Sequence, residues 1–309
     1  CSLGDWVVNA EKMPGGMGAF ARQINDLGMR FGLWFEPEMI SPDSDLYRAH
    51  PEWCLHVDGR DRTEARQQLI LDYCRPEVQD YIIEAVSSVL RSAHIEYVKW
   101  DMNRNMTEGF SETLPPQRRM ESQHRYMLGL YRVLEAVTEA FPEVLFESCS
   151  GGGGRFDCGM LCYMPQTWTS DDTDAYERIR IQYGTSMVYP CSAMGAHVSA
   201  VPNHQTGRVT PFKTRCEVAL GGNFGFELDL SRISQEDMAT AREAVARVKR
   251  LRGVLQRGSY SRLVSPFENR NFAAWQYVSE DGARAVLCMY QPHVEPNGRP
   301  FSVRMTALE

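Results

Sequence analysis

An alternation of short apolar runs with segments of helical periodicity constrains the fold of this chain more than any other feature. Each apolar run ends in a polar or charged residue, and the segments between the runs repeat apolar residues at helical spacing. The runs predict strands at 30–37, 69–72, 97–101, 145–148, 165–169, 194–199 and 224–230. The periodic segments predict helices at 15–27, 76–93, 117–140, 175–187 and 234–252. Such alternation predicts a parallel sheet, and a run of seven units predicts an α/β fold of the TIM (β/α)8-barrel type.

The ends of the predicted strands carry side chains that can do chemistry. A complete barrel has eight strands, so we expect the missing first strand to lie upstream of Cys1. Active sites in such barrels lie at the carboxyl ends of the strands. We therefore expect one rim to collect Glu36, Asp72, Asp101, Glu147, Cys149 and Asp171.

The pattern changes after Gly258. Runs at 262–264, 272–278 and 283–290 read as strands, and a Ser-Glu-Asp-Gly turn joins the last two as an antiparallel hairpin. We therefore predict a barrel domain over 1–255, lacking its first strand, and the start of a truncated antiparallel β-domain over 256–309. The chain has no initiator Met and ends within a strand pattern, so we expect it to be a piece of a longer protein.

Composition narrows the classes of partner and the compartment. The formal net charge of -7 argues against nucleic acid and against an anionic membrane surface. No apolar run approaches the roughly 20 residues that span a bilayer, and no leader pattern begins the chain. The nine cysteines form no disulfide framework, and Cys158 and Cys162 lack the second ligand pair of a zinc site. We expect no metal, and reduced thiols in a cytoplasmic protein.

The run from Tyr97 to Asp101 places a carboxylate at the end of a strand. Alternation puts Lys99 and Asp101 on one face, and Val98 and Trp100 on the other. The Lys99 ammonium would favour the ionised form of Asp101, as a nucleophile or general base needs. The alternative is a structural Lys–Asp pair at a strand end.

Asp171 is the best partner for Asp101. Two carboxylates facing each other across a pocket are what glycoside hydrolysis requires. Trp168 and the neighbouring aspartates would favour a protonated Asp171, as an acid needs. The alternative role is a helix N-cap in an acidic loop, although Asp172 or Thr173 can also cap the helix at 175–187.

A glycine run and two tryptophans suit a sugar pocket. Gly151 to Gly154 let a ligand approach the backbone, although a tight strand-to-helix turn explains them equally well. Trp34 and Trp168 would form the pocket wall, although a single tryptophan is more often part of a core. We expect His197 and His204, in late loops, to be structural or peripheral.

Four ordered motifs together carry a resemblance to a known family. They are 34–39 (WFEPEM), 99–104 (KWDMNR), 149–157 (CSGGGGRFD) and 168–174 (WTSDDTD). They resemble the melibiase-type α-galactosidases of glycoside hydrolase family thirty-six, and the similarity covers essentially the whole chain. The resemblance implies a (β/α)8 barrel, an N-terminal β-sandwich, a C-terminal antiparallel domain, no cofactor, and hydrolysis of terminal α-galactosides with retention.

The resemblance also implies roles for individual residues. Asp101 matches the nucleophile and Asp171 the general acid/base. The matching substrate-binding positions are Trp34, Arg66, Lys99, Asn103, Cys149, Gly151, Gly152 and Trp168. The partner would be a small oligosaccharide, and the full-length protein is a candidate homo-oligomer.

Two departures keep alternatives open. The aspartate pair that the family places at the first barrel strand lies outside this chain, as does the β-sandwich, so the activity of the fragment itself is open. Close alternatives are an α-N-acetylgalactosaminidase or a galactosyl-transferring enzyme. Alternatives of another class are a non-catalytic sugar-binding protein and an inactive fragment.

Overall fold

The computed structural model describes residues 2–298 and 300–307, and the chain divides into two compact units, Cys1–Pro165 and Gln166–Glu309. Cys1, predicted above to be a reduced thiol, lies outside the described residues. The predicted domain boundary between residues 255 and 256 stays a prediction.

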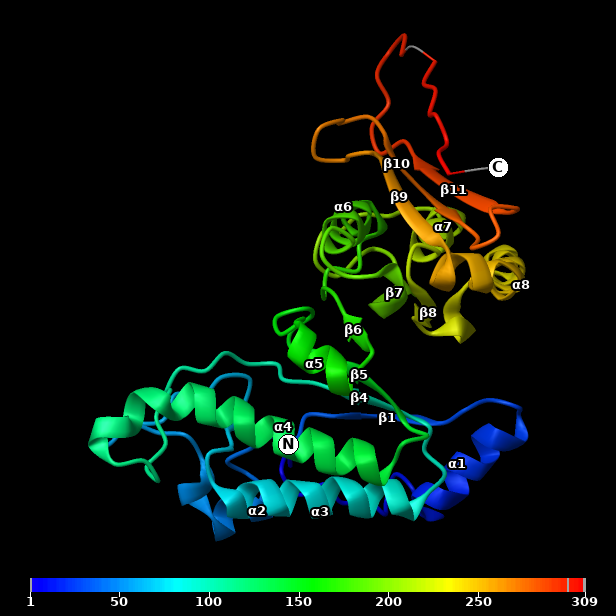
Figure 1. Cartoon of the computed structure of the whole chain (residues 1–309). Helices are drawn as coiled ribbons and strands as arrows, with labels where there is room; N and C mark the ends of the chain where they lie inside the picture. Colours follow the sequence, from blue (N-terminus) through cyan, green and yellow to red (C-terminus); the bar gives the residue numbers. More distant parts are fainter. Residues whose placement is uncertain (1, 299, 308–309) are drawn as a thin grey trace. The chain divides into compact units, whose positions relative to one another are not determined.

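The first unit is built on three parallel strands. Strands β1 (Gly32–Phe35), β4 (Tyr97–Trp100) and β5 (Leu145–Ser148) pair in that order (Figure 1). The register sets Trp34 opposite Lys99, and Lys99 opposite Glu147. The helices are α1 (Gly16–Asp26), α2 (Asp45–Ala49), α3 (Pro76–Ser92), α4 (Ser122–Ala140) and α5 (Cys158–Tyr163), with 3-10 turns η1 (Pro51–Trp53) and η2 (Pro116–Glu121).

Helices α3 and α4 run side by side in this unit (Figure 1). Pro76 opens α3, where its missing N–H costs nothing, and Val78, Ile82, Val86 and Leu90 form its buried stripe. The unit has one hydrophobic core, which also includes the strand residues Phe35, Val98, Trp100 and Phe146. The three strands are therefore fixed by this hydrophobic core, which also fixes the positions of their carboxyl ends.

The predicted barrel strand at 69–72 is wrong. Strand β3 (Leu69–Ile70) pairs antiparallel with β2 (Met39–Ile40), and β1 pairs directly with β4. A parallel strand needs a crossover of a dozen residues or more, usually helical. Between β1 and β3 the chain forms β2, short turns and the five-residue α2 but no long crossover helix, so β3 pairs locally with β2 instead.

The second unit combines a parallel and an antiparallel sheet. Strands β6 (Gln166–Trp168), β7 (Met194–Ser199) and β8 (Asn223–Glu227) pair in parallel. Strands β9 (Ser259–Val264), β10 (Ala273–Val278) and β11 (Ala285–Tyr290) are antiparallel, so the predicted hairpin is confirmed. The helices are α6 (Ala175–Thr185), α7 (Phe212–Ala219) and α8 (Gln235–Arg257), with turns η3 (Cys191–Ala193) and η4 (Leu230–Arg232). An α/β fold with parallel strands and a separate antiparallel sheet is thus confirmed.

Three local expectations in this unit need correction. Helix α8 continues through Gly253, because Val254 and Leu255 are buried and their packing outweighs the roughly 1 kcal/mol that a helical glycine costs. Helix α7 was not predicted at all. The N-cap of α6 is Asp174, whose carboxylate accepts from the Tyr176 N–H, rather than Asp172 or Thr173.

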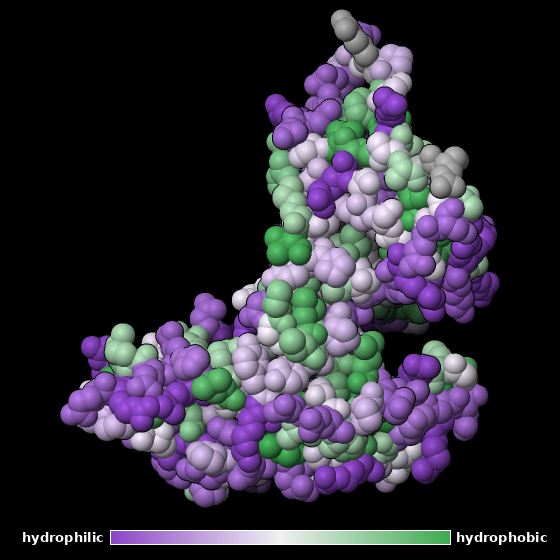
Figure 2. Space-filling view, viewed as in Figure 1, coloured by the Kyte–Doolittle hydropathy of each residue, from purple (hydrophilic) through white to green (hydrophobic). Residues whose placement is uncertain are grey.

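The visible surface of both units is mostly hydrophilic, with hydrophobic residues in smaller patches (Figure 2). Among the described residues, no helix combines the length and the apolar character that crossing a membrane would require.

Candidate active site

Asp101 directly follows β4. Its backbone N–H donates to Phe35 O at 2.8 Å, which continues the ladder between β4 and β1. Val98 and Trp100 are fully buried, as the alternation predicts, and Asp101 itself is 4% exposed. The backbone therefore fixes the carboxylate beside the end of β1.

Trp34 on β1 contacts this carboxylate. Its indole Nε1–H donates to Asp101 Oδ2 at 3.0 Å, and the Met102 N–H donates to Oδ1 at 2.9 Å. Trp34 is 45% exposed, unusual for so large an apolar side chain, so its ring is available to a ligand. An exposed aromatic face beside an oriented carboxylate suits a sugar.

Replacing Trp34 by Phe keeps an aromatic surface and removes the N–H donor. On the α-galactosides that the family resemblance implies as substrates, we expect kcat of the full-length protein to fall by about 10-fold to 100-fold, because the donor orients the carboxylate that the resemblance implies as the nucleophile. The control is Trp53→Phe, at a half-buried tryptophan stacked on His50. Steady-state kinetics checks this, and equal losses in both variants would contradict the role.

Lys99 on β4 lies beside the Glu147 carboxylate of β5. Its Nζ is 3.9 Å from Glu147 Oε1, and Tyr97 donates its hydroxyl to Glu147 Oε2. Burial, with the nearby Glu147 charge, raises the pKa of Tyr97 far above its ordinary value, so the phenol stays a donor. That Lys99 also acts on Asp101 stays a prediction.

Cys149 follows β5 and its N–H donates to Trp100 O at 2.8 Å. Its thiol is 1% exposed. Burial, then the neighbouring Asp101 charge, raises the pKa of Cys149 well above its ordinary value. The thiol is therefore neutral at physiological pH, suited to packing or weak hydrogen bonding rather than to nucleophilic attack.

The glycine run forms a tight turn. Gly151 and Gly152 have φ values of 53° and 86°, which side chains with a Cβ rarely adopt. Ser150 N–H donates to Gly152 O at 2.8 Å, and Ser150 Oγ donates to Met102 O at 3.2 Å. The turn is thus tied to the segment that follows Asp101.

A buried ion pair anchors the end of this turn. Arg155 makes two hydrogen bonds of 2.8 Å to Glu38, one to each carboxylate oxygen. Glu38 is fully buried and also accepts from Trp100 Nε1 at 3.0 Å and from the Tyr126 hydroxyl at 2.6 Å. This network joins the ends of β1 and β4 to the glycine turn, and the sequence reasoning missed it.

Glu36 supports the loop after Asp101. Its carboxylate accepts from the Asn103 N–H at 2.7 Å and from Gln68 Nε2 at 2.9 Å. Burial is the main cause that raises the pKa of Glu36 above 4.5, Asp101 adds to it, and the bonds from Asn103 and Gln68 oppose it.

This raised pKa predicts a pH-dependent cost. Folded Glu36 binds its proton more tightly than unfolded Glu36, so its contribution to stability falls as pH rises from 4.5 through the folded pKa. The free energy of unfolding of the full-length protein, minus that of Glu36→Gln, should therefore decrease between about pH 4 and pH 7. Urea unfolding at a series of pH values measures the difference, and an increase would contradict the sign.

Arg66 sits at the tip of a two-residue hairpin. Ala65 and Gln68 exchange backbone hydrogen bonds, and Arg66 and Gln67 have φ of 55° and 60°. Side chains at such φ cost roughly 1–2 kcal/mol per residue. The strained turn leaves Arg66 exposed, with its Nη1 3.3 Å from Asn103 O.

Asp171 lies at the edge of a cavity of about 340 Å³ in the second unit. Trp168 Nε1–H donates to Asp171 Oδ1 at 3.0 Å, and Asp171 is exposed. The α6 cap is supplied by Asp174, so Asp171 is not held by that structural role. Trp168 also lines the cavity, although only 2% of it is exposed, and its role as the wall of a sugar pocket stays a prediction.

The predicted rim residue Asp72 belongs elsewhere. It is buried, accepts from Ser111 Oγ and from the Cys74 N–H, and pairs with Arg75 at 3.4 Å. Burial raises the pKa of Asp72. Because β3 is not a strand of the parallel sheet, this carboxylate stabilises the start of α3.

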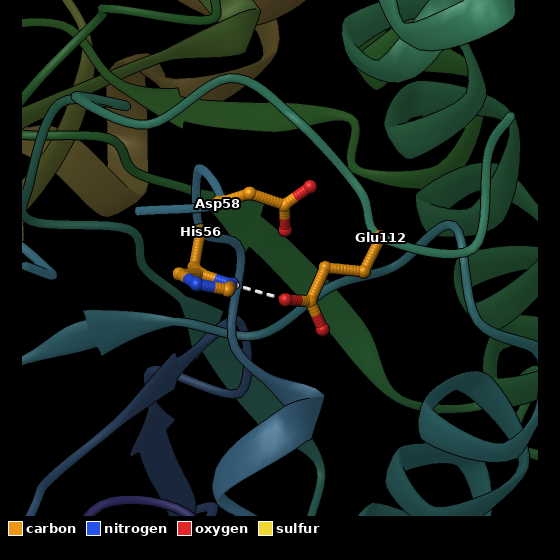
Figure 3. Close-up of side chains that lie close together, drawn as sticks. All are labelled: His56, Asp58 and Glu112. Carbon is orange, nitrogen blue, oxygen red and sulfur yellow. Dashed lines mark ion pairs between the residues drawn. The ribbon is translucent and has the colours of Figure 1, made fainter. Parts of the chain in front are cut away.

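Within the described part of the first unit, His56, Asp58 and Glu112 form a group of side chains of the kind that can bind a metal ion (Figure 3). Their ligand atoms lie within 4.8 Å of one another, and His56 Nδ1 is 2.6 Å from Glu112 Oε1. Arg119 pairs with Asp58 at 2.6 Å, and Arg75 lies 3.8 Å from Glu112. These guanidinium groups already supply positive charge, so we describe the group as an ion-pair network.

Comparison with known proteins identifies relatives over the whole chain. A family model described as Melibiase matches residues 1–258. The α-galactosidase AgaA of Geobacillus stearothermophilus is 58% identical over 308 residues, covering 100% of this chain and 42% of AgaA. The bifunctional α-galactosidase/sucrose kinase AgaSK of Mediterraneibacter gnavus is 46% identical over 308 residues, covering 100% of this chain and 32% of AgaSK. The chain therefore spans less than half the length of these relatives.

Comparison with solved structures also identifies α-galactosidases. The crystal structure of GH36 α-galactosidase AgaA matches with a TM-score of 0.97, covering 100% of this chain and 43% of AgaA. The α-galactosidase of Lactobacillus brevis matches with a TM-score of 0.98 at 48% identity, covering 100% and 42%. AgaA variants have been solved in complex with raffinose and with stachyose. Since the Melibiase model matches far more than half of its residues, this chain belongs to the melibiase family.

Proposed function

We propose that the full-length protein is a retaining α-galactosidase that hydrolyses terminal non-reducing α-galactosides of the melibiose and raffinose type. Asp101 attacks the anomeric carbon while Asp171 donates a proton to the departing glycosidic oxygen. Asp171 then takes a proton from a water molecule, and the water oxygen attacks the anomeric carbon. The ester bond to Asp101 breaks, and galactose leaves with the anomeric configuration of the substrate.

The observation that carries this proposal is the Trp34–Asp101 contact. An ordered carboxylate that accepts an indole N–H beside an exposed aromatic face suits attack on a bound sugar. Two AgaA complexes add support, because each contains a variant with a substituted aspartate. The two substituted aspartates are separated by as many residues as Asp101 and Asp171 are here.

Several wider properties belong to the same proposal. The described residues contribute six parallel strands, so a (β/α)8 barrel needs two further strands from the full-length protein.

The eight cysteines among the described residues are all free, which supports a cytoplasmic location.

Proton NMR of raffinose hydrolysis tests the proposal. Galactose should appear first as the α-anomer, and the β-anomer as first product would contradict retention. Turnover only of N-acetylgalactosaminides would favour the alternative glycosidase. If calorimetry shows that the protein binds galactose without turnover, the result favours a non-catalytic sugar-binding protein. If it shows neither binding nor turnover, the result favours an inactive protein.

A further inference from the structure

His197 makes two contacts that lead to Asp171. Its imidazole stacks on the Trp168 indole, with ring centroids 4.4 Å apart and planes at 23°. Its Nδ1 lies 3.3 Å from Glu227 Oε2, at the end of β8. Trp168 in turn donates its indole N–H to Asp171. The contacts therefore form one series, from Glu227 through His197 and Trp168 to Asp171.

The β7–β8 pairing makes room for the imidazole. His197 lies opposite Gly225, and a Cβ at Gly225 would sit only 3.0 Å from His197 Cδ2. Arg178, whose guanidinium lies 4.8 Å from the Trp168 ring centroid, is held by Gly195 O at 2.7 Å. Trp168 thus has fixed neighbours that determine where its N–H points.

We propose that His197, held by Glu227, is a positioning residue for the general acid: it keeps the Trp168 indole in the orientation that holds Asp171 toward the departing oxygen. The inference rests on the proposed function. Because the His197 ring stacks on Trp168, and Trp168 is the group that donates to Asp171, His197 acts through Trp168. This proposal gives His197 a more specific role than the structural or peripheral one expected from the sequence.

The test separates two leaving groups. Raffinose needs a proton on its departing oxygen, whereas 2,4-dinitrophenolate leaves without one. In the full-length protein, His197→Ala should lower kcat/KM for raffinose by about 10-fold to 100-fold, and that for 2,4-dinitrophenyl α-galactoside by less than about 3-fold. Because kcat/KM reports steps up to the first irreversible bond cleavage, it isolates the acid role of Asp171 from its later role as base.

Two further variants make the result decisive. Gly225→Ala removes no side chain but crowds His197, and should reproduce the same preference between substrates. His50→Ala is the matched control, since His50 also stacks on a tryptophan, Trp53 at 4.0 Å, and pairs through Nδ1 with a glutamate, Glu52 at 3.1 Å. It should change neither value.

Equal losses on both substrates, or no loss on raffinose, in a folded His197→Ala protein would overturn the positioning role. That result leaves the proposed function standing. If the unmodified protein hydrolyses neither substrate, the proposed function itself fails.

Discussion

The Asp101→Gly variant of the full-length protein will hydrolyse an aryl α-galactoside at least about 10⁴-fold more slowly than the unmodified protein, as expected when a covalent nucleophile is lost. Glu38 in the same unit is also buried and also accepts an indole N–H, but it is paired with Arg155, whereas Asp101 contacts an indole that is 45% exposed. Steady-state kinetics measures the loss.

Azide should restore part of this activity. The glycine leaves space beside the anomeric carbon, so the small anion can attack from the side that Asp101 occupied and give the β-galactosyl azide. Asp5→Gly is the control, because the Asp5 carboxylate accepts backbone N–H groups from Asp45 and Leu46, at the start of α2. Asp5→Gly should keep turnover and show no response to azide. Unchanged hydrolysis in Asp101→Gly would refute the assignment.

The second large effect is the loss of unfolding free energy that we expect in Glu38→Ala. Glu38→Ala removes the partner of Arg155 and the acceptor of Trp100 and Tyr126, all in a buried setting. Leaving such a charge uncompensated costs about 3–5 kcal/mol of unfolding free energy. The glycine turn, which Arg155 anchors, should lose its fixed position at the same time, so turnover should fall with stability.

A surface pair provides the control for this prediction. Arg118 and Glu121 make two hydrogen bonds of 2.8 Å, matching the geometry of Arg155 and Glu38, but their side chains are 50% and 41% exposed. Glu121 also pairs with Arg125, but because these charges are exposed to solvent, Glu121→Ala should lower the free energy of unfolding much less than Glu38→Ala does. Chemical denaturation of the two variants measures both losses, and similar values would contradict the importance of burial.

Much of the local structure follows from the sequence. An apolar run ending in a carboxylate correctly located β4 and Asp101, because burial on one face and charge on the other leave few alternatives. The helix starts predicted at 76 and 234 are correct to within one residue, because Pro76 at the first turn and the Ser234 cap are signals that act within one turn. Trp34 and Asp101 were both expected in the site, and the structure joins them by a hydrogen bond.

The remainder depends on contacts between distant residues. Nothing near Arg155 indicates that it pairs with Glu38, which lies 117 residues away. The strand at 69–72 was placed wrongly, because the composition of a short apolar run does not reveal its pairing partner. Arg66 and Gln67 occupy the central positions of a tight turn, where Asn-Gly is usual, so their residue types do not predict the turn. The burial of Trp168 likewise depends on His197 and Arg178.

Trapping the covalent intermediate tests the central claim most directly. A fluorinated α-galactosyl donor with a good leaving group forms the glycosyl-enzyme and slows its hydrolysis, so peptide mass spectrometry can locate the attached sugar. We predict an ester-linked galactosyl group on Asp101 and its absence in Asp101→Gly. A sugar on another carboxylate, or inactivation without any covalent adduct, would contradict the assignment of Asp101 as the nucleophile.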